Sequence, residues 1–181
     1  VLSRRQKELG VICVDIGSSC TGVTIFEEGI LRHACIIPVG GEYVTSDIAL
    51  GVRVSVDVAE KLKTDYVDLT FCDLAKPKDE EIPLSRIDKK ETETVSKLYL
   101  SQIAQARYKE ILSLVNHELK KVGRDGMLPE GAVFVGGGSK ARNLIELAKS
   151  ELRLPCAIGF PEDQEFVTGT SVSDPGFAGA I

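Results

Sequence analysis

The stretch from Gly10 to Phe26 constrains the fold more than any other part of this 181-residue chain. It reads GVICVDIGSSCTGVTIF, in which the apolar runs Val11–Ile16 and Val23–Phe26 flank a short polar turn. Two β-rich runs joined by a small turn between glycines predict a β-hairpin. Gly29 then predicts a second turn, and residues 30–39 predict a third strand of the same meander.

The turn of the hairpin allows two interpretations. Glycines let a backbone approach a ligand closely, and successive exposed N–H groups form a concave site for an anion. The hydroxyls of Ser18, Ser19 and Thr21 add neutral donors, and Asp15 could hold the water shell of a cation. These features favour a phosphate-binding turn, but an ordinary hairpin with small residues explains the same pattern. No Walker A motif occurs, so such a site would not be a P-loop.

The composition narrows the class of protein. A net charge of −5 and no basic stripe argue against nucleic acid as a partner. No apolar run approaches the ~20 residues that span a bilayer, and the first residues lack the apolar core of a signal peptide. The five cysteines form no CxxC pair, which predicts a reduced, cytosolic compartment without a disulfide framework or a zinc site. His33 and His117 lie far apart in the sequence and are expected to be structural or surface residues.

Helical patterns occupy most of the middle of the chain. Residues 43–50 predict a short helix that ends at Gly51, and Ser55 is a suitable cap for a second helix. Residues 66–71 form a β-like run in what is expected to be a small inserted unit. The longest predicted helix lies between about residues 92 and 122, where apolar residues recur at helical spacing. At ~1.5 Å per residue it would be roughly 45 Å long, enough to bridge two subdomains.

Arg107 interrupts the apolar stripe of that long helix, because it stands four residues from both Ile103 and Ile111. Arginine is not expected in such a stripe without a partner. One interpretation is a structural ion pair, for example with Glu110 one turn on. The other is recognition of a binding partner.

The final third of the chain predicts a strand–turn–helix unit. Residues 132–135 form the strand, Gly136–Ser139 the turn, and a helix continues to about Leu152, followed by a strand at Cys156–Ile158. Glycines between a strand and a helix let a ligand approach a helix N-terminus. Residues 173–181 predict the start of another helix, so we expect the whole protein to extend beyond both ends of this chain. No Ser-His-Asp or Cys-His set has a convincing spacing.

Four segments of the chain are distinctive. They are VDIGSSCTGVTIFEEGILRHACIIPVGGEYVTSDIA near the start, AEKLK at residues 59–63, ARYKEIL at residues 106–112, and VGGGSKARNLIELAKSELRLPCAIGFP at residues 135–161. These segments resemble the FtsA family of actin-like bacterial cell-division proteins. The closing SDPGFAGAI is similar to the terminal core helix of that family. The resemblance covers nearly the whole chain in the right order.

The resemblance implies an α/β fold of the actin-like ATPase and ribonuclease-H-like type, with a small inserted α+β subdomain. Residues 1–64 and 131–181 would form the nucleotide-facing subdomain. Residues 65–130 would form the inserted subdomain and carry the long helix.

The resemblance also implies a site for ATP with Mg. The positions that match its phosphate loop are Asp15, Gly17, Ser18, Ser19, Cys20, Thr21 and Gly22, and Asp15 would face the water shell of Mg. Glu60 and Lys63 match the positions that contact the ribose. The positions that border the adenosine are Gly136, Gly137, Gly138 and Lys140.

The chain departs from the family at this site. The family often has GGGTTD in the phosphate turn, whereas Gly22 stands here in place of the acid, and Ser18 and Ser19 narrow the approach. We therefore do not expect rapid hydrolysis. The first lobe of the family, with its own phosphate loop, is also missing, so we expect this chain alone to bind ATP weakly or not at all.

The function implied by the resemblance is that of a protein that binds ATP, forms filaments and links FtsZ to the inner face of the cell membrane at the division site. The inserted subdomain would bind the C-terminal tail of FtsZ, with Lys97 and Arg107 as candidate contacts, and a membrane-binding helix would follow Ile181. Two alternatives stay open. One is a scaffold of type IV pili similar to PilM, which binds a short peptide of a membrane partner. The other is a sugar or acetate kinase of the same fold.

Overall fold

The computed structural model describes residues 1–73, 79–161 and 174–177, and these form an α/β structure. The helices are α1 Arg4–Leu9, α2 Gly41–Val52, α3 Val56–Tyr66, α4 Lys97–Lys121 and α5 Leu144–Leu152. The strands are β1 Val11–Ile16, β2 Thr21–Glu27, β3 Ile30–Ile37, β4 Glu81–Pro83, β5 Thr94–Ser96, β6 Ala132–Val135 and β7 Cys156–Ile158. Short 3₁₀ turns are η1 Phe71–Asp73, η2 Leu84–Arg86, η3 Gly137–Lys140 and η4 Pro175–Phe177.

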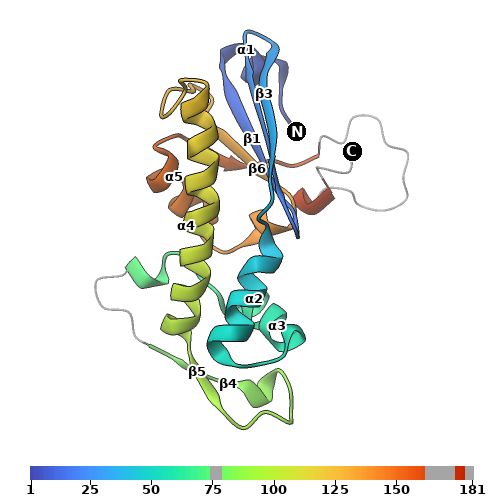
Figure 1. Ribbon diagram of the computed structural model, residues 1–181, viewed down its shortest axis with the longest axis vertical. Coiled ribbons are helices and arrows are strands. Elements are labelled where there is room, and N and C mark those ends of the chain that lie inside the picture. Colours follow the sequence, from blue (N-terminus) through green and yellow to red (C-terminus); the bar gives the residue numbers. More distant parts are fainter. Residues whose placement is uncertain (74–78, 162–173, 178–181) are drawn as a thin grey trace.

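Five strands form one mixed sheet in the order β3-β2-β1-β6-β7 (Figure 1). The first three strands form the predicted antiparallel meander, and β6 and β7 run parallel to β1. In the register, Asp15 of β1 is paired with Gly22 of β2 on one side and with Val135 of β6 on the other. Because β1 and β6 are parallel neighbours, the turns that follow them lie side by side at the carboxyl end of these strands.

The alternation of side chains along the sheet fixes which face forms the core. Ile12, Val14 and Ile16 of β1 are fully buried, as is Phe134 of β6. These side chains belong to one continuous apolar cluster that includes residues of α4 and α5, such as Leu112. Full burial of each such side chain contributes about 1.5–3 kcal/mol, which holds the turns at the end of β1 and β6 in fixed positions.

Helices α2 and α3 confirm two predicted helices, although the expected limits of the first were wrong. Helix α2 begins after Gly40 and continues past Gly51 to a left-handed Arg53. Gly51 lies inside the helix and allows α4 to pack closely, since a Cβ there would be 2.6 Å from Cδ1 of Ile103. The predicted cap of α3 is present, since Oγ of Ser55 accepts a hydrogen bond from the amide of Val58.

The β-like run expected at residues 66–71 is wrong. Helix α3 continues to Tyr66, and residues 71–73 form the 3₁₀ turn η1. The backbone between them bonds to other elements in place of a neighbouring strand: the carbonyl of Leu69 accepts from Nε2 of Gln105, and its amide donates to Arg142. Tertiary contacts therefore override the local β preference here.

Helix α4 is the predicted long helix, but it starts at Lys97, five residues later than expected. Residues 94–96 form β5, which pairs with β4 in a second sheet of two strands. Ser96 then caps α4 by accepting from the amide of Tyr99. The 25 residues of α4 give a length of about 37 Å at 1.5 Å per residue.

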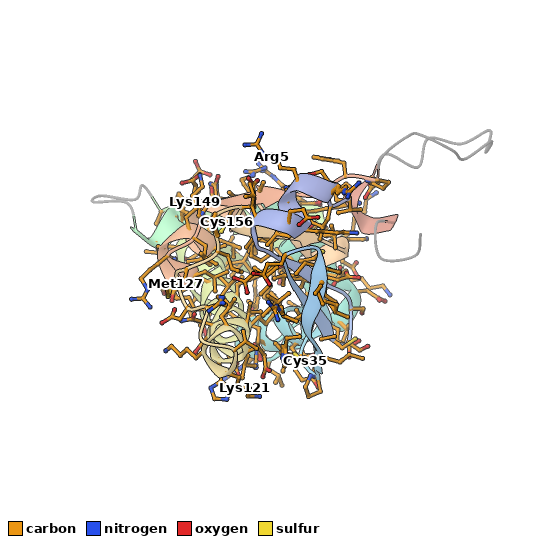
Figure 2. The ribbon with its side chains drawn as sticks, turned by 90° about the horizontal axis from the view of Figure 1, so that it is seen from above. Arg5, Cys35, Lys121, Met127, Lys149 and Cys156 are labelled. Atoms are coloured by element: carbon orange, nitrogen blue, oxygen red, sulfur yellow. The ribbon has the colours of Figure 1, made fainter. Side chains whose placement is uncertain are left out.

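Figure 1 shows α4 upright beside the sheet, with α2, α3 and the β4–β5 pair around its lower half. Figure 2 shows the same arrangement from above, with Cys35 of β3 and Cys156 of β7 on the two edge strands of the sheet. The division into residues 1–64 with 131–181 and residues 65–130 stays a prediction. Of the helix predicted at residues 173–181, only the turn η4 and Asp174 lie within the described residues.

Candidate functional site

The hairpin turn after β1 is held in place by the start of α2. The amide of Gly17 donates to the carbonyl of Cys20, at 3.0 Å, which closes the turn. The carbonyls of Gly17 and Ser18 then accept from the amides of Gly41 and Glu42, each at 2.9 Å. Among the described residues, no hydrogen bond occupies the amides of Ser18, Ser19 and Cys20. These three amides therefore have no internal acceptor in the described structure, which is compatible with a phosphate-binding turn.

Gly40 explains how α2 can lie so close to this turn. A Cβ on Gly40 would be 2.4 Å from the carbonyl oxygen of Ser18 and 2.7 Å from the amide nitrogen of Cys20. Only glycine fits at that distance. The Gly40-Gly41 pair, which directly follows the predicted third strand, thus sets the shape of the turn.

The side chains of the turn have different surroundings. The hydroxyl of Thr21 is buried and donates to the carbonyl of Val39 at 2.8 Å, so it is committed to the fold. The hydroxyl of Ser18 donates to Glu42 at 3.2 Å, and Ser19 is exposed. Of the three predicted hydroxyl donors, only those of Ser18 and Ser19 lie on the open side of the turn.

Asp15 lies at the junction of the two turns. A Cβ on Gly136 would be 2.3 Å from Oδ1 of Asp15, so the carboxylate touches the glycine turn after β6. Within the described parts of the chain, Asp15 belongs to no group of three potential metal ligands. A lone carboxylate suits Mg, which keeps several of its waters and takes one or two carboxylates together with phosphate oxygens.

A cavity of about 560 Å³ brings many of the predicted site residues together. Its walls come from the hairpin turn, the start of α2, helix α3, α4 and the glycine turn. The predicted residues that line it are Gly17, Ser18, Glu60, Lys63, Gly137, Gly138 and Lys140. The predicted residues outside its lining are Asp15, Ser19, Cys20, Thr21, Gly22 and Gly136. The volume is in the usual range for a small-molecule site, about 300–1,000 Å³.

Lys63 and Glu60 form one hydrogen-bonded group with Thr45 of α2. The ammonium of Lys63 donates to Oε2 of Glu60 at 2.7 Å, to Oγ1 of Thr45 at 2.8 Å and to the carbonyl of Gly41 at 3.2 Å. These bonds use all three donors of a lysine. Burial would raise the pKa of Glu60, but hydrogen bonds from Lys63 and Thr45 outweigh it and lower that pKa. Lys63 therefore holds Glu60 charged and in position at the wall of the cavity.

The three glycines after β6 are not equivalent. A Cβ on Gly138 would be 2.3 Å from Cγ2 of Ile16, and Gly136 adopts a φ of +84° against Asp15. A Cβ on Gly137, by contrast, would meet nothing within 4 Å. Gly136 and Gly138 are thus required by packing against β1, whereas Gly137 faces open space in the cavity wall.

Tyr108 of α4 is a site residue that sequence analysis missed. It lines the cavity, is 2% exposed, and its hydroxyl donates to the carbonyl of Gly138 at 2.9 Å. Burial raises the pKa of Tyr108, so its hydroxyl stays a donor. Its helical position beside Arg107 resembles that of any core tyrosine, and no sequence signal connects it to a turn 30 residues further on.

Lys140 at the end of the glycine turn is paired with Asp174. Its ammonium donates to Oδ2 of Asp174, and the amide of Gly136 donates to the carbonyl of Pro175 at 2.9 Å. About half of the Lys140 side chain is exposed. Residues 174–177 thus contact both ends of the glycine turn through these two bonds.

The two predicted partner-binding cations on α4 both have partners within the chain. Arg107 donates from Nε and Nη2 to the two carboxylate oxygens of Asp47, at 2.6 and 3.0 Å, and from Nη1 to Glu110 at 2.6 Å. The predicted ion pair with Glu110 is present, and Asp47 of α2 is an additional partner. The ammonium of Lys97 lies 3.5 Å from Oε2 of Glu80 and 5.1 Å from the centre of the Phe71 ring.

In the described part of the chain, no helix is both long and apolar enough to cross a membrane.

The comparisons with solved structures place this arrangement in a known fold. The structure of MreB 5 of Spiroplasma citri bound to AMPPNP has a TM-score of 0.67 at 20% identity, over 84% of this chain and 49% of the other. A PilM-PilN type IV pilus biogenesis complex has a TM-score of 0.62 at 17% identity, over 87% of this chain and 37% of the other. At these identities the likeness concerns the fold alone, and it confirms the predicted actin-like ATPase fold.

The comparison of sequences identifies the family. The family model described as "Cell division protein FtsA" matches residues 12–181. The cell division protein FtsA of Pseudomonas aeruginosa is 37% identical over 163 residues, which are 89% of this chain and 38% of that protein. The chain spans about two fifths of the length of the curated relatives it matches, between 38% and 43%. The chain therefore belongs to the FtsA family.

Proposed function

We propose that the chain is the nucleotide-facing part of a cell-division protein that binds ATP with Mg in the cavity between the hairpin turn, α3 and the glycine turn. One observation carries the proposal. Ser18, Glu60 and Gly137, which match a phosphate, a ribose and an adenosine position, line the same cavity although they lie far apart in sequence. The AMPPNP-bound state of MreB 5, which has the same fold, supports it.

The proposed roles follow from the hydrogen bonds of each residue. The amides of Ser18, Ser19 and Cys20 bind phosphate oxygens, because no bond among the described residues occupies them. Asp15 acts through the water shell of Mg, and Glu60 accepts hydrogen bonds from ribose hydroxyls. Backbone amides and helix ends are well suited to phosphate, and carboxylates to sugar hydroxyls.

The glycine turn would admit the adenine ring. Gly137 is the position that gives it room, since Gly136 and Gly138 already face Ile16 and Asp15. Lys140 lines the cavity and sits at the rim, where its salt bridge to Asp174 leaves it about half exposed. A half-exposed ion pair contributes little to stability, so Lys140 is free to exchange Asp174 for an anionic ligand at small cost.

The proposal extends to the cellular role of the longer protein. As a member of the FtsA family, it would form filaments and link FtsZ to the cytoplasmic face of the membrane at the division site, with membrane attachment through a segment outside this chain. We place the C-terminal tail of FtsZ on the first half of α4, near Lys97. Arg107 would act there by holding α2 against α4, because its Nε, Nη1 and Nη2 atoms all donate to Asp47 or Glu110 already.

The test of the nucleotide site is binding of ATP with Mg to the full-length protein. Glu60→Gln and Gly137→Val should each weaken binding about tenfold or more, which equals about 1.4 kcal/mol. Glu146→Gln on α5 is a matched control, because Glu146 pairs with Lys149 outside the cavity lining. Unchanged affinity in both cavity variants would refute the site. This 181-residue chain alone should bind ATP more weakly than about 1 μM, or −8.2 kcal/mol.

A further inference from the structure

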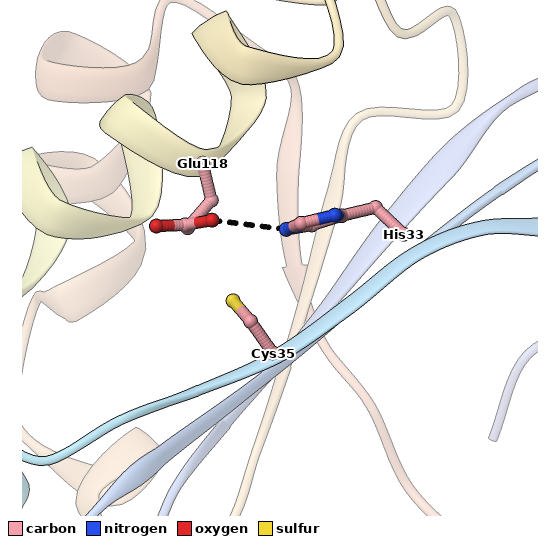
Figure 3. A group of neighbouring side chains, drawn as sticks. All are labelled: His33, Cys35 and Glu118. Atoms are coloured by element: carbon pink, nitrogen blue, oxygen red, sulfur yellow. Dashed lines mark hydrogen bonds and ion pairs between the residues drawn. The ribbon is translucent and has the colours of Figure 1, made fainter.

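The edge strand β3 and helix α4 meet at a group of three side chains that the nucleotide site does not use. His33 and Cys35 stand two residues apart on β3 and therefore point to the same face of the sheet. Glu118 of α4 faces them across the interface (Figure 3). One ligand atom of each residue lies within 4.8 Å of the others, and in the described ranges this is the one such group of three.

The distances are close to those of a metal site. Nε2 of His33 and Oε2 of Glu118 are 2.9 Å apart. In a tetrahedral zinc site, bonds of about 2.0–2.3 Å place neighbouring ligand atoms about 3.3–3.6 Å apart. Figure 3 shows the sulfur of Cys35 directed toward the space between the imidazole and the carboxylate. Small side-chain movements are therefore enough to place an ion among the three atoms.

The surroundings also suit a cation. Glu118 is 8% exposed and the side chain of His33 is 23% exposed, so both are largely shielded from water. Oε1 of Glu118 accepts from the ammonium of Lys121 at 2.6 Å, which leaves Oε2 as the ligand oxygen. An ion pair between His33 and Glu118 accounts for two of the three residues. A hydrogen bond from the Cys35 thiol to Glu118 accounts for the third residue, and a cation among the three atoms would take the place of both contacts.

We propose that His33, Cys35 and Glu118 bind a zinc ion that fastens β3 to α4, with water as the fourth ligand. The donor set selects the metal. Thiolate and imidazole suit Zn²⁺, whereas Mg²⁺ and Ca²⁺ prefer oxygen ligands. Sequence spacing cannot reveal this site, because 85 residues separate His33 from Glu118.

Titration of the untagged, metal-free chain with Co²⁺ tests the proposal. Cobalt in place of zinc should give a thiolate-to-cobalt charge-transfer band at one equivalent, and Zn²⁺ should displace it. Even residues that only orient a metal ligand change affinity by about 10–100-fold. Cys35→Ser and His33→Asn should therefore each weaken binding by about 100-fold or more and abolish or shift the band. Zn²⁺ should raise the melting temperature of the wild type and not that of Cys35→Ser.

Two matched controls separate a ligand from a structural residue. Cys13→Ser removes another cysteine. Cys13 is paired with Thr24, whereas Cys35 is paired with the residue before Thr24, so the two cysteines lie on opposite faces of the sheet. Arg124→Gln breaks a different contact near the end of α4, the bidentate pair with Glu27, and lowers stability without removing a ligand atom. Both should keep the band. Absence of a band in the wild type, or its persistence in Cys35→Ser, would overturn the proposal.

Discussion

Replacing Arg107 by alanine removes the ion pair that ties α4 to α2. The side chains of Arg107 and Asp47 are 23% and 28% exposed, so the pair is neither fully buried nor on the open surface. An exposed pair contributes about 0–1 kcal/mol, whereas hydrogen bonds to charged groups contribute about 1.5–3 kcal/mol. Partial exposure favours a loss of about 1.5–2 kcal/mol for Arg107→Ala. For a chain of this size, that lowers the melting temperature by roughly 3–8 °C.

A double-mutant cycle measures this contribution directly. Urea unfolding of Arg107→Ala, Asp47→Ala and the double variant should give a coupling energy of about 1–1.5 kcal/mol between the two residues. Lys109→Ala, two positions further along α4, is the matched control for loss of a cation. Its effect should stay within about 0.5 kcal/mol, as for most surface substitutions.

The same variants test whether Arg107 contacts the proposed partner, the C-terminal tail of FtsZ. Because Asp47 and Glu110 already hold its guanidinium, Arg107→Ala should change the affinity for a tail peptide, measured by fluorescence anisotropy, by less than about threefold, or 0.7 kcal/mol. A coupling energy near zero, together with a tenfold loss of peptide affinity, would refute the structural role. That result would indicate that Arg107 contacts the tail peptide directly.

Three further outcomes follow from the candidate site. Tyr108→Phe leaves the carbonyl of Gly138 without its donor, so urea unfolding should show a loss of about 1–3 kcal/mol with an unchanged m-value. Gly138→Ala should destabilise by about 1–3 kcal/mol or more because its Cβ meets Ile16, while Gly137→Ala should leave the melting temperature nearly unchanged. Hydrogen bonds lower the pKa of Glu60 in the folded state, so its contribution is present above the ordinary value of 4.5 and is lost as pH falls through the lowered value. Melting curves of Glu60→Gln and the wild type should therefore converge in acid, and a constant difference would contradict this.

The sheet was predictable because local patterns define its strands. The runs at Val11–Ile16 and Val23–Phe26 surround a short turn, and hairpin pairing needs no information from distant residues. The start of α4 was not predictable in the same way. Residues 94–96 have a helical context, yet they pair with β4, whose own sequence around Pro83 gives a weak strand signal.

The candidate site shows the same division between local and distant information. The resemblance assigned residues to the site, but it could not separate Gly137, which faces the cavity, from Gly136 and Gly138, which pack against β1. It also could not find Tyr108, because a hydrogen bond from α4 to a glycine turn depends on how the helix crosses the sheet. Long-range contacts of this kind have no periodic signature in a single sequence.

Helix α4 links three separate parts of the described structure. It is one unbroken element of about 37 Å, and it is attached at Arg107 to α2, at Tyr108 to the glycine turn and at Glu118 to β3. A ligand that displaced the carbonyl of Gly138 would also act on Tyr108, its hydrogen-bond donor, and through Tyr108 on α4. Occupancy of the cavity is therefore expected to affect both the β3 edge of the sheet and the β4–β5 pair, which α4 connects.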